Sequence, residues 1–258
     1  MNNRGSQMLP DLQIYLLGSF RLLINGAVVP NAAWEKRKAK LLVQILALLP
    51  TRAAHREKLI EKLFPETDEM TAKARFYRIL YVARRAFEPG RASYTSSNFL
   101  VSDGQNIKLT AAGGVWVDAD EFELKAQAGL KTNNQSLLEA AAALYTGDLL
   151  VDEPFEEWLM SRREEAKMLF HNVLHRLAEN EVTRQDVEKA HYWLDKVLQI
   201  EPADETAHRT KMRLFCRQGE RFRALRQYEK CAEVLKQEFS VDPDEETKRL
   251  RQKIAAAG

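Results

Sequence analysis

The sequence has little of what a secreted, disulfide-bonded or membrane-spanning protein needs. It contains only two cysteines in 258 residues, Cys216 and Cys231, and both fall in segments with helical patterning. They form neither a disulfide framework nor a zinc-type spacing, which favours free thiols in a reducing compartment. No stretch approaches the roughly 18–20 apolar residues of a membrane span, and the polar first ten residues lack an apolar signal core. We therefore expect a cytoplasmic protein without a membrane partner, and a loose N-terminal tail.

Recognisable motifs for catalysis are also missing. The sequence has no GxxxxGK[ST] phosphate loop and no GxSxG nucleophile turn. His171 and His175 stand four residues apart on a predicted helix, a spacing that can bind a metal ion, but no glutamate base lies between them as in HExxH. We interpret this pair as structural or solvent-facing. The sequence thus predicts no enzyme, no cofactor and no metal site.

The charges that are present are distributed unevenly. Residues 1–117 carry 17 Lys and Arg against 9 Asp and Glu, whereas the remainder carries 22 against 28. A basic front half joined to an acidic back half indicates two domains with different partners. We place them at residues 11–117 and 118–258. With 45% hydrophobic residues, the chain has enough apolar side chains for two cores.

The front half alternates between strand and helix patterns. Residues 12–18 and 20–24 are short apolar runs, and Asn25-Gly26 is a strong hairpin signal, which predicts a small antiparallel sheet. Amphipathic patterns predict helices over 34–49, 55–64 and 74–87, and two further strands over 98–102 and 107–110 enclose a hairpin turn. Sheet, three helices and a terminal hairpin make a winged helix-turn-helix, with the third helix for recognition and the hairpin as the wing.

The third predicted helix has one apolar and one basic face. Phe76, Leu80, Ala83 and Phe87 share the apolar stripe, whereas Arg78, Tyr81 and Arg85 lie opposite, with Arg75 and Val82 beside them. No carboxylate occurs between Lys73 and Phe87. Such a face suits a polyanion, because arginine forks match phosphate oxygens and the guanine edge. The alternative is a solvated helix face that is basic by chance.

The back half is patterned almost wholly as helix from about residue 118. Ala190, Leu194 and Val197 recur in type as Ala224, Tyr228 and Cys231, which is a period of 34 residues with Gly219 at a turn. This period is typical of tetratricopeptide repeats, in which small residues let paired helices approach closely. The alternative is a helical bundle with a coincidental echo. The chain as a whole is therefore predicted to be α+β, a winged helix followed by an all-α tetratricopeptide-like domain.

The order of these segments resembles a known family. The front stretches WEKRKAKLLVQILALL, HREKLIEKLFP, RILYVARRAF and LVSDGQNIKL resemble the OmpR/PhoB-type DNA-binding domain of the streptomycete antibiotic regulatory protein (SARP) family. The stretches ALYTGDLLVDEPFEEWL and QGERFRALRQYEKCAEVLKQEFSVDPDEETKRL resemble the bacterial transcriptional activator domain of the same regulators. The resemblance implies DNA binding by the front domain, and activation through contact with RNA polymerase or through self-association on DNA. Val82 stands where the family usually has arginine, and Asp103 lies near where its wing is usually basic.

Roles for single residues follow from their positions. We expect Arg78 and Arg85 to face the groove, with Tyr81 between them, and Lys73 and Arg75 near the helix start to contact phosphate or base edges. Arg84 lies nearer the buried side and is expected to form a salt bridge, for example to the second helix, as readily as to contact DNA. The predicted DNA-binding residues are Lys36, Arg37, Lys40, Lys73, Arg75, Arg78, Tyr81, Arg85 and Lys108.

Two functions remain in view from the sequence. The first is a sequence-specific DNA-binding transcriptional regulator, more an activator than a repressor, with double-stranded DNA and RNA polymerase as partners. The second is a protein-interaction scaffold that works through its tetratricopeptide-like groove. Salt-sensitive binding to DNA distinguishes the first from the second.

Overall fold

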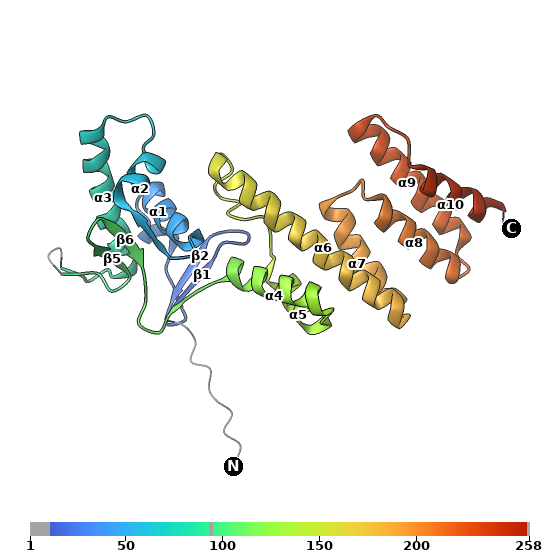
Figure 1. Cartoon of the computed structure of the whole chain (residues 1–258), viewed down its shortest axis with the longest axis horizontal. Helices are drawn as coiled ribbons and strands as arrows, with labels where there is room; N and C mark the ends of the chain where they lie inside the picture. The colour runs from blue at the N-terminus through green and yellow to red at the C-terminus, as the bar shows by residue number, and fades with distance from the viewer. Residues whose placement is uncertain (1–10, 93–94, 257–258) are drawn as a thin grey trace, which may run out of the picture. The chain divides into compact units, whose positions relative to one another are not determined.

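The structure is a computed structural model that describes residues 11–92 and 95–256 (Figure 1). Contacts divide the chain into a front unit, which comprises the residues up to Glu121 together with Thr146–Glu156, and a rear unit, which comprises Phe122–Tyr145 and the residues from Glu157 onward. The predicted N-terminal tail lies outside the described residues. The predicted functional boundary after residue 117 stays a prediction.

The front unit begins with a four-stranded sheet in the order β3-β2-β1-β7. Its strands are β1 (Leu12–Tyr15), β2 (Arg21–Ile24), β3 (Ala27–Val28) and β7 (Val115–Val117). Asn25 and Gly26 form the predicted two-residue turn between β2 and β3, and both have positive φ, as this tight hairpin requires. The predicted antiparallel sheet is confirmed for β1, β2 and β3, which pair antiparallel in that order. The sequence did not predict β7, which pairs with β1 in parallel. A three-residue strand is too short for its pattern to stand out in the sequence.

The rest of the front unit has the predicted winged-helix architecture. Its elements are α1 (Arg37–Leu48), β4 (Ala53–His55), α2 (Arg56–Leu63), α3 (Glu69–Phe87), β5 (Leu100–Asp103) and β6 (Asn106–Leu109). Strands β5 and β6 form the wing hairpin, and β4, which the sequence did not predict, adds to its other side in the order β4-β6-β5. Fully buried Leu42, Phe76 and Leu100 bring α1, α3 and the wing into one core.

The backbone N–H and C=O groups at the end of β1 form hydrogen bonds with residues that come much later in the chain. The buried Asp118 carboxylate accepts hydrogen bonds from Leu16 N (2.7 Å) and Leu17 N (3.0 Å). Gly18 N donates to the carbonyl of Asp148 (3.0 Å), and Leu150 N donates to the carbonyl of Leu16 (2.7 Å). Buried amides need such partners, so the front unit requires residues beyond its own β-strands and helices.

The segment 146–156, here called the return strap, supplies most of these partners. Leu149 and Leu150 are 2% and 0% exposed. Asp152 accepts a hydrogen bond from Phe20 N (3.1 Å), and the Thr146 hydroxyl donates to the carbonyl of Leu17 (2.6 Å). The return strap therefore adds both apolar burial and polar ties to the front unit.

The rear unit is helical and starts with the two helices that lie between the front unit and the return strap. Its helices are α4 (Asp118–Thr132, of which the first four residues belong to the front unit), α5 (Gln135–Leu144), α6 (Met160–Arg184), α7 (Val187–Ile200), α8 (Glu205–Arg217), α9 (Arg221–Phe239) and α10 (Glu245–Ala256). Helices α6 and α7 pack as one pair and α8 and α9 as the next (Figure 1). Ala190 and Ala224, at equivalent positions of the 34-residue period, are both fully buried. This confirms the tetratricopeptide-like prediction.

Polar ties fix the flanking helices to these pairs. Buried Glu181 of α6 accepts a hydrogen bond from the Gln135 amide of α5 (2.8 Å). Buried Arg209 of α8 donates to Asp244 (2.7 Å) and Thr247 (2.9 Å) at the start of α10.

Within the described residues, none of the helices combines the length and the apolar composition that crossing a bilayer requires.

Leu150→Ala should destabilise the front unit by about 2–5 kcal/mol, because it removes a fully buried side chain and leaves a cavity. Hydrogen exchange of peptides that cover β1 and β2 measures this loss separately from the rear unit. Val151→Ala is the matched control, because Val151 is 44% exposed, and should change stability by less than about 0.5 kcal/mol. Unchanged exchange in the Leu150 variant would show that the return strap does not stabilise β1.

Asp118→Asn should cost about 1–3 kcal/mol of unfolding free energy, because an amide accepts only one of the two backbone hydrogen bonds and turns its NH2 group toward the other donor. Urea denaturation of the purified full chain measures the loss. Asp120→Asn is the control: Asp120 is about half exposed and forms an ion pair with Arg52, so its loss should cost at most about 1 kcal/mol. Equal effects of the two substitutions would contradict the role given to Asp118.

Candidate functional site

Helix α3 is longer than the sequence predicted. The Asp68 carboxylate accepts a hydrogen bond from Thr71 N (3.0 Å) and caps a helix that starts at Glu69, five residues before the predicted start. Residues 69–73, which precede the predicted start, therefore belong to the helix. The apolar stripe is buried as expected: Phe76, Leu80 and Phe87 are at most 5% exposed. Their burial fixes which side of α3 faces solvent.

The opposite side of α3 carries the side chains that the sequence assigned to DNA. The exposed members of the predicted set on this helix are Arg75, Arg78, Tyr81 and Arg85, and Lys73 is partly exposed. Val82, which the helical projection placed beside them, is 5% exposed, so that placement was wrong. Because Val82 packs into the core, an arginine at this position would have to leave it.

Two acidic side chains lie beside this basic face. Lys73 forms an ion pair with Glu69 one turn earlier in the helix. The guanidinium of Arg85 lies 3.9 Å from the Glu35 carboxylate and 6.0 Å from the centre of the Tyr81 ring. These contacts are solvent-exposed and therefore weak, so phosphate oxygens can displace the carboxylates.

The basic cluster at the start of α1 is more strongly engaged. Arg37 donates hydrogen bonds to Glu153 and Glu156 of the return strap, both at 2.7 Å. Lys40 lies 4.0 Å from the buried Glu153 carboxylate, and Lys36, just before the helix, is partly exposed. The structure thus uses Arg37, together with Lys40, to hold the return strap.

Lys38, which stands between Arg37 and Lys40 in the sequence, joins two helices. Its amino group donates to the carbonyl of Leu63 at the end of α2 (2.5 Å) and lies 4.2 Å from the centre of the Phe64 ring. Burial lowers the pKa of the Lys38 amine. A cation at a helix C-terminus offsets the partial negative charge of its last carbonyls.

The wing carries Lys108 on its exposed face, where side chains alternate with buried Ile107 and Leu109. Asp103 and Asn106 pair across the tip. The guanidinium of Arg84 donates to the carbonyl of Leu100 (2.9 Å) and to the Ser102 hydroxyl (2.8 Å). Arg84 therefore fixes β5 to α3, rather than pairing with an acid of α2, and burial lowers its pKa.

Sequence reasoning missed two residues of this surface, Arg56 and Tyr77. Arg56 begins α2 and donates to the Tyr77 hydroxyl (2.7 Å) and to Gln105 at the wing tip. Tyr77 is 50% exposed on α3. Its position four residues before Tyr81 was a signal in the sequence, whereas Arg56 is brought to α3 only by the fold.

The exposed face of α3 thus combines arginines with aromatic rings, next to the β5–β6 hairpin that Arg84 ties to this helix. Arginines on one helix face reach base edges and phosphates when the helix lies in a major groove, while a hairpin beside it follows the backbone. The opposite, fully packed face keeps the helix rigid. The site thus has the form of a docking surface for a polyanion.

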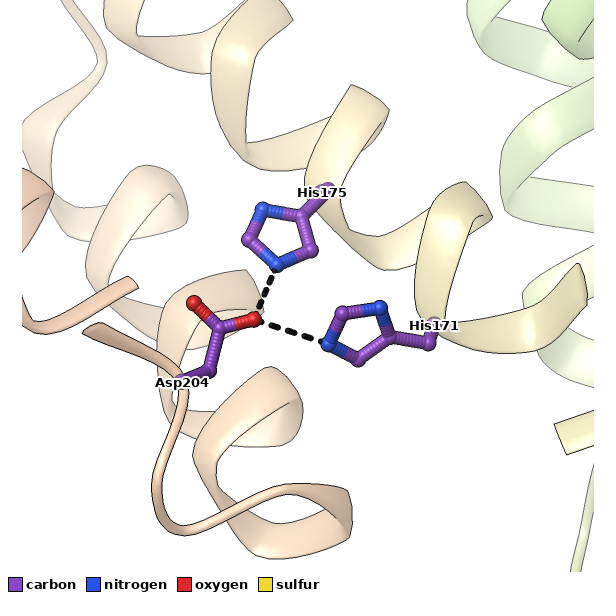
Figure 2. Close-up of side chains that lie close together, drawn as sticks. All are labelled: His171, His175 and Asp204. Atoms are coloured by element: carbon purple, nitrogen blue, oxygen red, sulfur yellow. Dashed lines mark hydrogen bonds and ion pairs between the residues drawn. The ribbon is translucent and has the colours of Figure 1, made fainter. Parts of the chain in front are cut away.

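A second cluster of polar side chains lies in the rear unit. His171 and His175 of α6 both direct Nε2 at one carboxylate oxygen of Asp204, at 2.9 and 2.7 Å (Figure 2). The other carboxylate oxygen caps α8 by accepting a hydrogen bond from Ala207 N (2.7 Å). Burial raises the pKa of Asp204, but the hydrogen bonds outweigh that effect and hold it below its usual value. Asp204 is distant in sequence from the histidines, so the pattern of α6 alone did not reveal it.

Comparison with known families identifies the rear part of the chain. A family model described as "Bacterial transcriptional activator domain" matches residues 117–255. The chain belongs to this family. The match confirms the resemblance to SARP-type transcriptional regulators and covers the helices that carry the 34-residue period. Members of the bacterial transcriptional activator domain family are transcriptional regulators rather than a class of enzymes.

A solved structure with a similar fold covers the front unit as well. The structure of Mycobacterium tuberculosis EmbR in complex with a low-affinity phosphopeptide matches 96% of this chain at 19% sequence identity, with a TM-score of 0.68. The present chain spans 65% of the length of that chain. At this identity the likeness shows a common fold of winged helix and helical domain. A search of curated protein sequences gave no match.

Arg84→Ala should destabilise the front unit by about 1–3 kcal/mol, because it leaves the carbonyl of Leu100 without this donor and detaches the wing from α3. Hydrogen exchange of the β5–β6 peptide measures the loosening. Arg85→Ala, one residue along and exposed, should change stability by less than about 0.5 kcal/mol. If both variants exchange like the wild type, Arg84 does not hold the wing.

Proposed function

We propose that this member of the bacterial transcriptional activator domain family is a sequence-specific DNA-binding regulator that activates transcription. Its front unit lays α3 in the major groove of double-stranded DNA, and the β5–β6 wing follows the adjacent backbone. The observation that carries the proposal is the solvent-facing set of α3, opposite a fully packed face: Arg75, Arg78, Tyr81 and Arg85.

Different residues serve affinity and specificity in this proposal. Arg78 and Arg85 face the groove, and an arginine fork suits the O6 and N7 acceptors of guanine. Tyr81 between them suits a thymine methyl group or a phosphate. Lys73 and Arg75 near the helix start, with Lys36 and Lys108 on the flanks, provide phosphate contacts that depend on salt. Arg37 and Lys40 contribute less, because Glu153 engages them.

The rear unit acts as the protein-binding module of the regulator. Paired helices of the tetratricopeptide type offer extended surfaces for a partner, and the family's role in activation supports RNA polymerase or a second copy of this chain as that partner. The protein would act in the cytoplasm, where the bacterial chromosome lies. A scaffold whose front unit binds another protein is the competing function.

Arg78→Ala should weaken binding to the cognate duplex by about 1–3 kcal/mol and relax base preference at one position. The cognate duplex is first recovered by selection of random duplexes with the full wild-type chain. Fluorescence anisotropy then compares affinities for this duplex and for its single-base variants over a range of salt concentrations.

Two controls make the experiment decisive. Arg249→Ala removes an exposed arginine of α10 and should leave DNA affinity unchanged. Arg75→Ala should weaken binding to all duplexes similarly and reduce the slope of log affinity against log salt by about 1. Equal losses for Arg78→Ala on cognate and random DNA would remove its base-reading role. Absence of any salt-sensitive binding by the wild type would favour the scaffold.

A further inference from the structure

The rear unit brings together a set of side chains that the DNA-binding proposal does not use. His171 and His175 lie one helical turn apart on α6, so both imidazoles leave the same side of the helix. Asp204 is the residue that caps the N-terminus of α8, and the whole of α7 separates it from the two histidines in the sequence. Tertiary packing thus converts a two-histidine helix motif into a three-residue cluster (Figure 2).

The three ligand-type atoms converge closely enough for one ion. The two Nε2 atoms and the carboxylate oxygen all lie within 4.8 Å of one another. In a tetrahedral zinc site, with bonds of about 2.0–2.2 Å, neighbouring ligand atoms lie about 3.3 Å apart. The present N···O separations of 2.9 and 2.7 Å would therefore widen by roughly half an ångström. Small side-chain rotations supply that movement.

The surroundings prepare the carboxylate for this role. Asp204 is 10% exposed at its side chain, against 25% and 20% for His171 and His175. The amide of Ala207 holds its other oxygen at 2.7 Å and so fixes the direction of the ligating one. Hydrogen bonds of this kind orient the ligands of a metal ion. The three side chains are thus partly exposed, and the amide of Ala207 holds the carboxylate in place.

We propose that His171, His175 and Asp204 form a binding site for a divalent transition-metal ion, with zinc as the reference ion. Two imidazoles and a carboxylate are ligands that suit Zn²⁺, and three protein ligands leave a position for water or for a group from another molecule. Binding replaces two N–H···O hydrogen bonds with three metal–ligand bonds. If a histidine is neutral, its proton moves from Nε2 to Nδ1 when the metal binds. If it is an imidazolium, it keeps the proton on Nδ1 and releases the proton on Nε2 to solvent.

The ion would clamp the first helix pair of the rear unit to the second. Its ligands come from the middle of α6 and from the N-terminus of α8, so bound metal restrains how these helices move relative to each other. When α6 and α8 keep a fixed relative position, the surface that the two helix pairs present to a partner varies less in shape. The proposal stands independently of DNA binding by the front unit.

The test uses the untagged full chain, stripped with EDTA and exchanged into metal-free buffer. Titration with Zn²⁺ in competition with a chromophoric chelator should give a single high-affinity ion per chain. Substitution with Co²⁺ should give the visible d–d absorption of a site with low coordination number. The thermal unfolding midpoint should rise with zinc concentration.

Three variants discriminate the site from non-specific binding. Asp204→Asn keeps the helix cap, since asparagine also accepts from Ala207 N, but removes the carboxylate, and His175→Gln keeps a donor for Asp204. Each of these two substitutions should weaken zinc binding by about 100-fold or more. Loss of a residue that only orients a metal ligand typically costs about 10–100-fold. His55→Asn, in the front unit at the cap of α2, is the matched control and should bind zinc like the wild type.

The outcomes separate cleanly. Loss of binding and of the Co²⁺ spectrum in Asp204→Asn and His175→Gln, with wild-type circular dichroism, supports the site. Zinc binding that is absent in the wild type, or equal in all four proteins, overturns it and leaves the cluster as a hydrogen-bonded tie between α6 and α8. Because Asp204→Asn retains the cap, a folding failure of His175→Gln leaves the test decisive.

Discussion

The buried end of β1 is the constraint on which the front unit depends. Its amides and carbonyls at Leu16–Gly18 cannot reach water, so they need fixed partners, and Asp118 and the return strap provide them. Both partners follow the winged-helix strands in the sequence. The chain therefore leaves the front unit, forms α4 and α5, and comes back before it enters the rest of the rear unit. The winged-helix fold and the activator domain are thus interleaved along the chain rather than joined by a simple linker.

This interleaving explains the unequal roles of the basic residues. Glu153 and Glu156 of the return strap engage Arg37, and Leu63 and Leu100 carbonyls accept from Lys38 and Arg84. Cations in these positions hold elements together. By contrast, the ion pair that the described residues show for Arg85, on the solvent-facing side of α3, is exposed and weak. Burial and pairing, more than residue type, therefore identify the cations that hold the front unit together.

Periodicity revealed the parts whose burial follows a regular repeat. The apolar stripe of α3 and the 34-residue echo in the rear unit are long patterns, and the structure buries them as expected. Short elements were not predicted from the sequence, because β4 and β7 have only three residues each. The start of α3 was predicted too late, because it depends on the Asp68 cap. Val82 was misplaced because a helix projection does not tell how wide the buried face is. That width is decided by what packs against the helix.

The sequence by itself determined the order of the longer helices and strands, the two-part division of charge, and the basic face of α3, because these depend on local spacing of residue types. Only the tertiary structure decided which cations are free, that β7 joins β1 in parallel, and that Asp204 meets His171 and His175. The physical reason is the same in each case. Hydrogen bonds and ion pairs between residues far apart in the chain have a range of a few ångströms, and no local pattern encodes which distant segments come that close.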